Sequence, residues 1–250
     1  HIMVRLADGD YDLGTHRVGR VTITEPISDQ PWIRQLGSTE MDKGYGVTVD
    51  ADGNVYVVGV TRGFLDGNVN VGGVQPNWAD PFMTKYDVEG NKLWTRQMGT
   101  TGWDYYTDVI VADDGSIYTL GYADGEGTTG YGDGHLSKWD SDGNQIWKKF
   151  IGGADHHEFL NSLTADQYGN VYVAGFKQIR EDDNSSNGLV IKYDSDGREI
   201  WTNEIDSGTV DRAREIKLDS QGNVYVLGRT EGSLDGNSSS GGSDLFLVKY

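Results

Sequence analysis

The stretch KYDVEGNKLW at residues 85–94 decides the fold, because close copies of it recur along the chain. KWDSDGNQIW occupies residues 138–147, KYDSDGREIW occupies residues 192–201, and Lys249-Tyr250 repeats the first two residues of the pattern. In each copy an Asp side chain can accept hydrogen bonds from backbone amides two or three residues on, and a Gly supplies a positive φ. Each copy therefore predicts a tight β-hairpin, and the chain is a repeat protein.

A second pattern marks the same repeat. GNVYVVG begins at residue 53, and similar heptapeptides begin at residues 115, 169 and 222, so their starts are 62, 54 and 53 residues apart. A Trp keeps step with this pattern. The chain therefore contains four units, which start near Trp32, Trp94, Trp147 and Trp201.

Each unit predicts four short strands, which in the first unit are expected at residues 32–36, 46–49, 55–60 and 82–86. The 55–60 strand and its copies are apolar on both faces, which indicates that neighbouring sheets cover both sides. The Trp-bearing strands carry charged residues, as edge strands do. Small four-stranded sheets repeated at about 40 to 55 residues are typical of propeller blades. We therefore predict an all-β fold in which residues 28–250 form a β-propeller.

Composition excludes several function classes. The chain has 250 residues, 36 Gly, 4 Pro, no Cys and a formal net charge of −18. This charge disfavours nucleic acid, which is bound by clustered Lys and Arg, and it favours association with cations. Disulfides and Cys-based metal sites are excluded. No apolar run approaches the roughly 18 residues of a transmembrane helix, so no membrane-spanning segment is expected.

The repeat resembles a known family. TRGFLDGN at residues 61–68, TEGSLDGN at 230–237 and GGSDLFLVKY at 241–250 accompany the two patterns above. Together they are similar to the bacterial SBBP β-propeller repeat over residues 32–250. The resemblance implies a fold rather than an activity. Because such repeats occur in large exported or surface proteins, it also implies an extracellular or cell-surface location.

Residues 1–27 contain no copy of the repeat. VRLADGDYDL and RVGRVTITEP read as two alternating strands around a polar turn, which predicts a β-hairpin segment. This segment resembles the end of a Calx-β domain, in which a Val-x-Leu strand, a Leu-Gly pair and a Val-Thr-Ile strand follow in this order. We therefore expect a separate segment of that kind before the propeller repeats.

The connections between strands sort onto two sides of the sheets. Because antiparallel strands alternate in direction, the short Asp-Gly turns fall on one side, here called the turn face. The longer and irregular connections fall on the opposite side, here called the loop face. Function in propellers is carried by loops held on a rigid scaffold, so a binding site is expected on the loop face.

Acidic residues recur five residues before the first apolar residue of each inner strand. One interpretation is a ring of carboxylates that binds Ca²⁺, because carboxylate oxygen suits a hard cation. The other interpretation is that each acid caps backbone amides where one blade passes to the next. This second interpretation is favoured, because a repeat copies structural residues more faithfully than binding-site residues. The four acids are Asp42, Asp104, Glu158 and Asp211.

Other candidate ligand-binding residues do not recur. Asp155, His156 and His157 lie where the third unit has an additional residue, but adjacent residues on an extended chain point to opposite sides, which favours a solvated loop over a transition-metal site. Aromatic residues stack on the apolar faces of sugar rings or pack beneath their own loops. Those with either option are Trp78, Trp103, Tyr105 and Tyr106.

The sequence supports two hypotheses of function. The first is a non-enzymatic extracellular or cell-surface module for adhesion, matrix or filament assembly or ligand display, with protein chains or surface polymers as partners. The alternative is a glycan-binding or glycan-processing domain that uses the loop face. No catalytic residue is identified by spacing.

The ends of the repeat array allow two arrangements. If residues 32–36 pair with residues 245–250, four blades close into a ring, and the match between four units and four Trp strands slightly favours this. If they do not, the blades form an arc whose open edges pair with missing repeats or with another chain, and self-assembly follows.

Overall fold

The computed structural model describes residues 31–68, 78–125, 128, 132–153, 156–179 and 185–250. These residues form fifteen antiparallel strands and no helix. The prediction of an all-β fold is therefore confirmed. The predicted hairpin of residues 1–27 lies outside the described residues.

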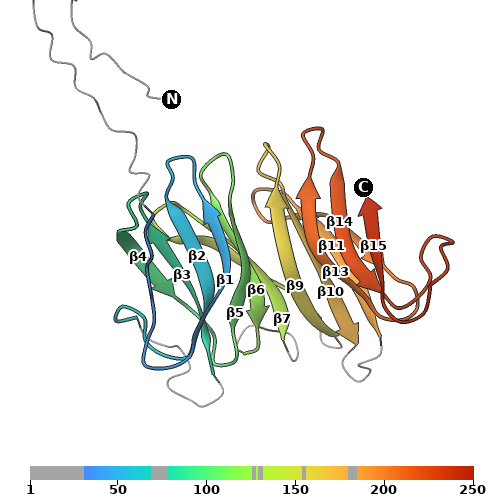
Figure 1. Cartoon of the computed structure of the whole chain (residues 1–250), viewed down its shortest axis with the longest axis horizontal. Helices are drawn as coiled ribbons and strands as arrows, with labels where there is room; N and C mark the ends of the chain where they lie inside the picture. The colour runs from blue at the N-terminus through green and yellow to red at the C-terminus, as the bar shows by residue number, and fades with distance from the viewer. Residues whose placement is uncertain (1–30, 69–77, 126–127, 129–131, 154–155, 180–184) are drawn as a thin grey trace, which may run out of the picture.

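The strands form four separate sheets, here called blades 1 to 4 in chain order (Figure 1). Blade 1 contains β1 (Asp42–Val49), β2 (Val55–Thr61), β3 (Asp80–Tyr86) and β4 (Lys92–Gln97). Blade 2 contains β5 (Tyr105–Val111), β6 (Ile117–Ala123), β7 (Asp133–Trp139) and β8 (Gln145–Ile151). Blade 3 contains β9 (His156–Ala165), β10 (Val171–Ile179), β11 (Ser186–Tyr193) and β12 (Glu199–Ile205). Blade 4 contains β13 (Asp211–Leu218), β14 (Val224–Thr230) and β15 (Asp244–Lys249).

Each sheet has its strands in chain order, from an inner strand that lies against the next blade to an outer edge strand. The inner strands of neighbouring blades are joined by side chains. Thr107 on β5 donates a hydrogen bond to the Leu160 carbonyl on β9 at 2.9 Å, and Asn161 on β9 donates to the Ala213 carbonyl on β13 at 2.8 Å. The four sheets are thereby held in one fan of blades.

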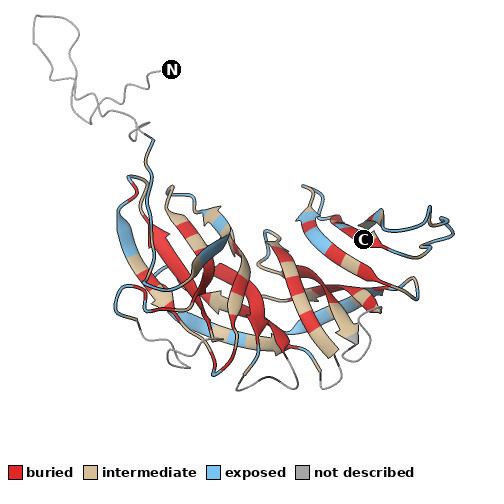
Figure 2. Cartoon of the chain, turned by 60° about the horizontal axis from the view of Figure 1, so that its bottom comes forward, coloured by how far each residue is buried: buried red, intermediate tan, exposed pale blue. Residues whose placement is uncertain are grey.

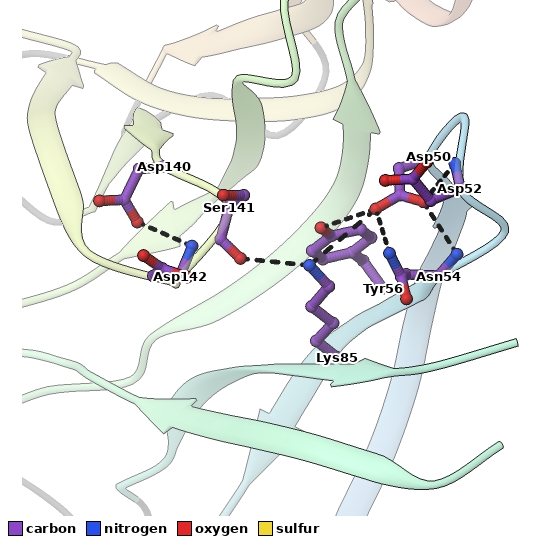
Figure 3. Close-up of polar contacts among 8 residues, drawn as sticks. All are labelled: Asp50, Asp52, Asn54, Tyr56, Lys85, Asp140, Ser141 and Asp142. Carbon is purple, nitrogen blue, oxygen red and sulfur yellow. Dashed lines mark hydrogen bonds and ion pairs between the residues drawn. The ribbon is translucent and has the colours of Figure 1, made fainter.

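The recurring Asp-Gly turn explains the sequence pattern that dominates the chain (Figure 3). Asp50 accepts hydrogen bonds from the Asn54 backbone and side-chain amides, both at 2.8 Å, and Gly53 has a φ of 84°. The Lys of the pattern reaches the following blade. Lys85 donates to the Ser141 carbonyl at 3.3 Å, and its ammonium lies 5.0 Å from the centre of the Tyr56 ring. The pattern therefore builds a turn and links that turn to its neighbour.

Apolar side chains fill the spaces between blades. Figure 2 shows that buried residues are concentrated in the strands of the blades. Between blades 1 and 2, Val58 and Met83 pack against Val109 with Trp94 at the margin. The Trp94 ring lies beside Gly143, which is in the turn of the next blade. Trp147 lies beside Gly197 in the same way. Trp94 and Trp147 therefore pack between neighbouring blades.

The predicted ring closure is wrong. Residues 32–36 form no strand, and β15 pairs only with β14, so blade 4 has three strands among the described residues. Trp32 instead donates to the Val88 carbonyl at 3.2 Å, in the turn of blade 1. Figure 1 shows blade 1 and blade 4 at opposite ends of the molecule. The described blades therefore form an open arc.

Candidate functional site

The recurring acids on the loop face bond to the chain beside them. Asp42 begins β1 and accepts hydrogen bonds from the Ser38 backbone amide at 2.6 Å and from the Ser38 and Thr61 hydroxyls. Asp211 begins β13 and accepts from the Ser207 amide at 2.6 Å and the Ser207 hydroxyl at 2.8 Å. Each carboxylate thus caps the loop that enters its blade.

Asp104 repeats this arrangement in a more enclosed setting. It accepts hydrogen bonds from the Thr100 backbone amide, from the Thr100 hydroxyl at 2.8 Å and from the Asp124 backbone amide at 3.1 Å. Its side chain is only 1% exposed. Burial raises the pKa of the Asp104 carboxyl, although the hydrogen bonds from Thr100 oppose this. Three donors on one carboxylate fix its orientation.

Glu158 departs from the pattern because it has one more methylene and follows the additional residue of the third unit. Burial, together with the nearby Asp133 carboxylate, raises the pKa of Glu158 to about 7. A hydrogen bond from the Gly153 backbone acts in the opposite direction. Gly152 lies under both carboxylates, because a Cβ there would meet Asp133 and come within 2.7 Å of Glu158 Oε2. Glu158 is therefore an acid of this face whose charge changes near neutral pH.

A second acid, which the sequence analysis missed, accompanies the recurring one at two junctions. Asp80 begins β3 and Asp133 begins β7, and both are almost fully buried. Asp80 lies over Gly99 together with Asp104, as Asp133 lies over Gly152 together with Glu158. Aligning the third strand of each unit would have revealed the position, which is occupied by Asp80, Asp133, Asn187 and Asp244.

The candidate aromatic residues have different surroundings. Trp103 is half-buried, and the Arg62 guanidinium lies 4.9 Å from its ring centre. Ala79, the neighbour of half-buried Trp78, forms a parallel bridge with Trp103, so the two backbone segments that carry these Trp residues lie side by side. This pair and Arg62 lie where blade 1 meets blade 2.

The two Tyr residues contribute mainly to packing. Tyr106 is 2% exposed and contacts the His135 ring edge to face at 5.4 Å. Tyr105 is half-buried and stacks on Tyr122 at 5.4 Å. Burial raises the pKa of Tyr105 to about 12, so its hydroxyl stays protonated at neutral pH.

His156 and His157 open β9, where neighbouring side chains alternate between the two faces of the sheet. His157 stacks on the Phe159 ring with a centroid distance of 6.0 Å. Asp155 lies outside the described residues. Within the described ranges, no three His, Asp or Glu side chains are grouped so that they would hold a metal ion.

The family comparison assigns the first repeat. Residues 32–64 match the SBBP family, which is described as a β-propeller repeat. The regulatory protein FlaEY of Caulobacter vibrioides is 32% identical over 166 residues, which cover 56% of this chain. The chain spans 17% of the length of that relative. These matches agree with the repeats and the blades described above.

The solved structures to which the chain is similar share little sequence with it. A protein of unknown function from Dyadobacter fermentans gives a TM-score of 0.49 at 11% identity, over 81% of this chain and 63% of its own. A xylan β-1,4-xylosidase from Bacillus halodurans gives 0.42 at 12% identity, over 84% of this chain and 42% of its own. No helix that would cross a membrane is present in the part of the chain that the structure describes.

Proposed function

We propose that this chain is a non-enzymatic β-propeller-repeat module of the cell exterior or surface, which presents its loop face to a protein chain or surface polymer. The observation that carries the proposal is the use of the recurring carboxylates as caps. Asp42, Asp104 and Asp211 each accept a hydrogen bond from a backbone amide of the loop that enters their own blade. Their hydrogen bonds hold the loops in place.

The same observation argues against hydrolysis of glycans on this face. A glycoside hydrolase uses two carboxyl groups that reach the substrate and whose pKa values are separated. Asp80 and Asp104 are buried, and Asp104 is directed to three donors of its own chain. The acids therefore support a rigid scaffold, and the variable loops above them supply the recognition surface.

Charge favours particular partners for this face. With a formal net charge of −18, the module attracts cationic segments of other proteins and repels polyanions. Ca²⁺ is proposed as an accessory ion that bridges the acidic surface to anionic polymers, because carboxylate oxygen is its preferred ligand. A partner that binds through charge should dissociate as the salt concentration rises.

Glycan binding without hydrolysis is a second candidate, and the Trp78 and Trp103 pair supports it. The half-buried Trp103 ring beside the Arg62 guanidinium offers stacking surface together with hydrogen-bond donors, which suits a sugar ring. This candidate uses the same face as the first. It differs in placing the contact at the junction of blades 1 and 2.

A glycan array probed with and without millimolar Ca²⁺, together with a hydrolysis assay on chromogenic glycosides, tests both candidates. The leading proposal predicts no turnover, and turnover that is lost in Glu158→Gln would overturn it. Glycan binding predicts array signals that fall at least tenfold in Trp103→Ala. The matched control is Tyr168→Ala, because Tyr168 is 76% exposed in a turn on the opposite face.

A further inference from the structure

The two ends of the arc carry apolar surfaces that nothing in the described chain covers. The leading surface is on β1 of blade 1, where Val47 is 65% and Val49 is 55% exposed. The trailing surface is on blade 4, where Leu227 is 45% and Leu247 is 65% exposed. Leu227 and Leu247 are paired across β14 and β15, so they form one patch. Figure 2 shows exposed segments in this last blade, beside the C-terminus.

The same positions are buried wherever a neighbouring blade is present. The residues equivalent to Val47 in blades 2 to 4 are at most 2% exposed, and they are Val109, Leu163 and Ile216. The residues equivalent to Leu227 and Leu247 in blades 1 to 3 are fully buried, and they are Val58, Leu120, Ala174, Met83, Leu136 and Val190. The exposure at the ends therefore comes from a missing neighbour and not from a different sequence.

The leading and trailing surfaces are the two halves of one interface. In every internal junction, the residues that correspond to Leu227 and Leu247 contact the residue that corresponds to Val47, as Val58 and Met83 contact Val109. The chain builds this interface three times. Its fourth set of matching halves lies at opposite ends of the arc, and they cannot meet within one chain.

The backbone at the two ends is complementary in the same way. Blade 4 lacks an outer strand next to β15 in the described chain. Residues 32–36 occupy the place of an outer strand against blade 1 but have no sheet to join. Arg34 donates to the Gly90 and Glu89 carbonyls as Arg96 donates to those of Gly143 and Asp142. This segment is thus held in position for a strand partner, and Ile33 within it is 91% exposed.

We propose that a second copy of this chain docks head to tail on the first. Residues 32–36 of one copy add to β15 of the other as its fourth strand, and Val47 of one copy packs against Leu227 and Leu247 of the other. The partner is a copy of the same chain because the leading surface of one copy matches the trailing surface of another. Neighbouring blades match in the same way inside the chain. The proposal is independent of the ligand that the loop face binds.

Lys249 gains a partner in this arrangement. Lys85 and Lys138 lie over the rings of Tyr56 and Tyr118 and donate to a carbonyl in the turn of the next blade, that of Ser141 or Ser195. Lys249 lies over the Tyr225 ring at 5.4 Å in the same way. The equivalent carbonyl for Lys249 is that of Val88 in the docked copy.

The contact is heterologous, so it closes a ring if the rotation allows and otherwise continues as a filament. Two copies in a closed ring would have eight blades, which is within the range of known propellers. Because each copy carries a net charge of −18, the copies repel at low ionic strength. Association should therefore strengthen from 20 mM to 500 mM NaCl, as screening removes the repulsion.

Sedimentation velocity on the chain and on two single-face variants tests the proposal. Val47→Asp blocks the leading surface and Leu247→Asp blocks the trailing surface, both at exposed positions. We expect the parent chain to associate as its concentration rises, and each variant alone to be monomeric. An equimolar mixture of the two variants retains one intact pair of surfaces, so it should form a complex of two chains and stop there.

Ile146→Asp is the matched control, because Ile146 is an exposed apolar residue of an internal blade at 56% exposure. It should associate like the parent chain. Circular dichroism melting curves establish that each variant is folded. A parent chain that is monomeric at 200 μM in 500 mM NaCl would overturn the docking of a second copy. Variants that associate as the parent does would also overturn it.

Discussion

At the scale of single residues, the recurring Trp joins one blade to the turn of the next. Trp94 packs edge to face on Tyr56 at 6.0 Å, and its ring lies beside Gly143 of the next blade. We expect Trp94→Ala to lower the free energy of unfolding by about 3 kcal/mol, since deleting a packed aromatic side chain costs about that amount. Leu93→Ala is the control, because Leu93 is 51% exposed, and it should cost less than about 1 kcal/mol. Urea denaturation distinguishes the two.

Glu158 should make the stability of the fold depend on pH near neutrality. Its folded pKa is about 7, above the ordinary value of 4.5, so the folded state binds more protons than the unfolded chain between these values. Stability therefore falls as pH rises from about 5 to 7. Glu158→Gln should remove most of this loss, about 2 kcal/mol at pH 8. Melting temperatures of the two proteins that change in parallel from pH 5 to 8 would contradict the assignment.

At the scale of the element, the Asp-Gly turn combines a left-handed backbone with a contact to the preceding blade. Gly143 has a φ of 77°, and a Cβ there would lie 3.1 Å from the Trp94 ring. Gly115 has a φ of 80°, but no atom lies within 4 Å of a Cβ there. Gly115→Ala should cost the backbone strain alone, about 1 kcal/mol, and Gly143→Ala about 1 kcal/mol more. Equal losses for both variants would show that the Trp contact is loose.

Elements were predictable from sequence where local chemistry determines them. The Asp-Gly turns fix hairpin register, so the strands at residues 46–49, 55–60 and 82–86 correspond to β1, β2 and β3 with longer ends. The segment at residues 32–36 was predicted as a strand because its Trp and Arg match those of β4. The Trp32 ring does lie beside Gly90 as the Trp94 ring lies beside Gly143. Arg34 donates to the Gly90 carbonyl as Arg96 donates to that of Gly143. It is not a strand, since strand formation needs a partner strand that local sequence cannot supply.

The candidate site was predictable in part for the same reason. The recurring acids could be found by counting back from each inner strand, because a cap repeats with the element that it caps. Counting back from the inner strand did not find Asp80 and Asp133, since each lies at the start of a third strand after an irregular loop. The neighbours of Trp103 were also unpredictable, because a cation over a ring depends on how two blades pack.

At the scale of the whole molecule, the acidic surface should respond to Ca²⁺. We expect millimolar Ca²⁺ to raise the melting temperature modestly relative to EDTA, because the cation reduces repulsion among the carboxylates that give the net charge of −18. Mg²⁺ at equal concentration controls for ionic strength. An identical melting temperature in Ca²⁺ and EDTA would remove Ca²⁺ from the account.

Ring closure is a property of the whole molecule, and local sequence patterns do not determine it. Four units with four Trp strands slightly favour a closed ring but do not determine it, because each blade contacts only its neighbours. The decision depends on the small rotation between successive blades, which accumulates along the array. This rotation leaves the two ends of the array apart, so Val47 and Leu247 are exposed.

The most direct test of the open arc is the distance between its two ends within one chain. Because the chain has no native Cys, spin labels can be placed at Ile33→Cys and Leu247→Cys, and the labelled chain diluted into unlabelled Leu247→Asp protein. Residues 32–36 lie against blade 1 and outside it, so four sheet spacings of about 10 Å separate them from blade 4 and predict a separation of up to about 40 Å by double electron–electron resonance. A separation typical of paired strands, about 5 Å between backbones, would show that the chain closes on itself.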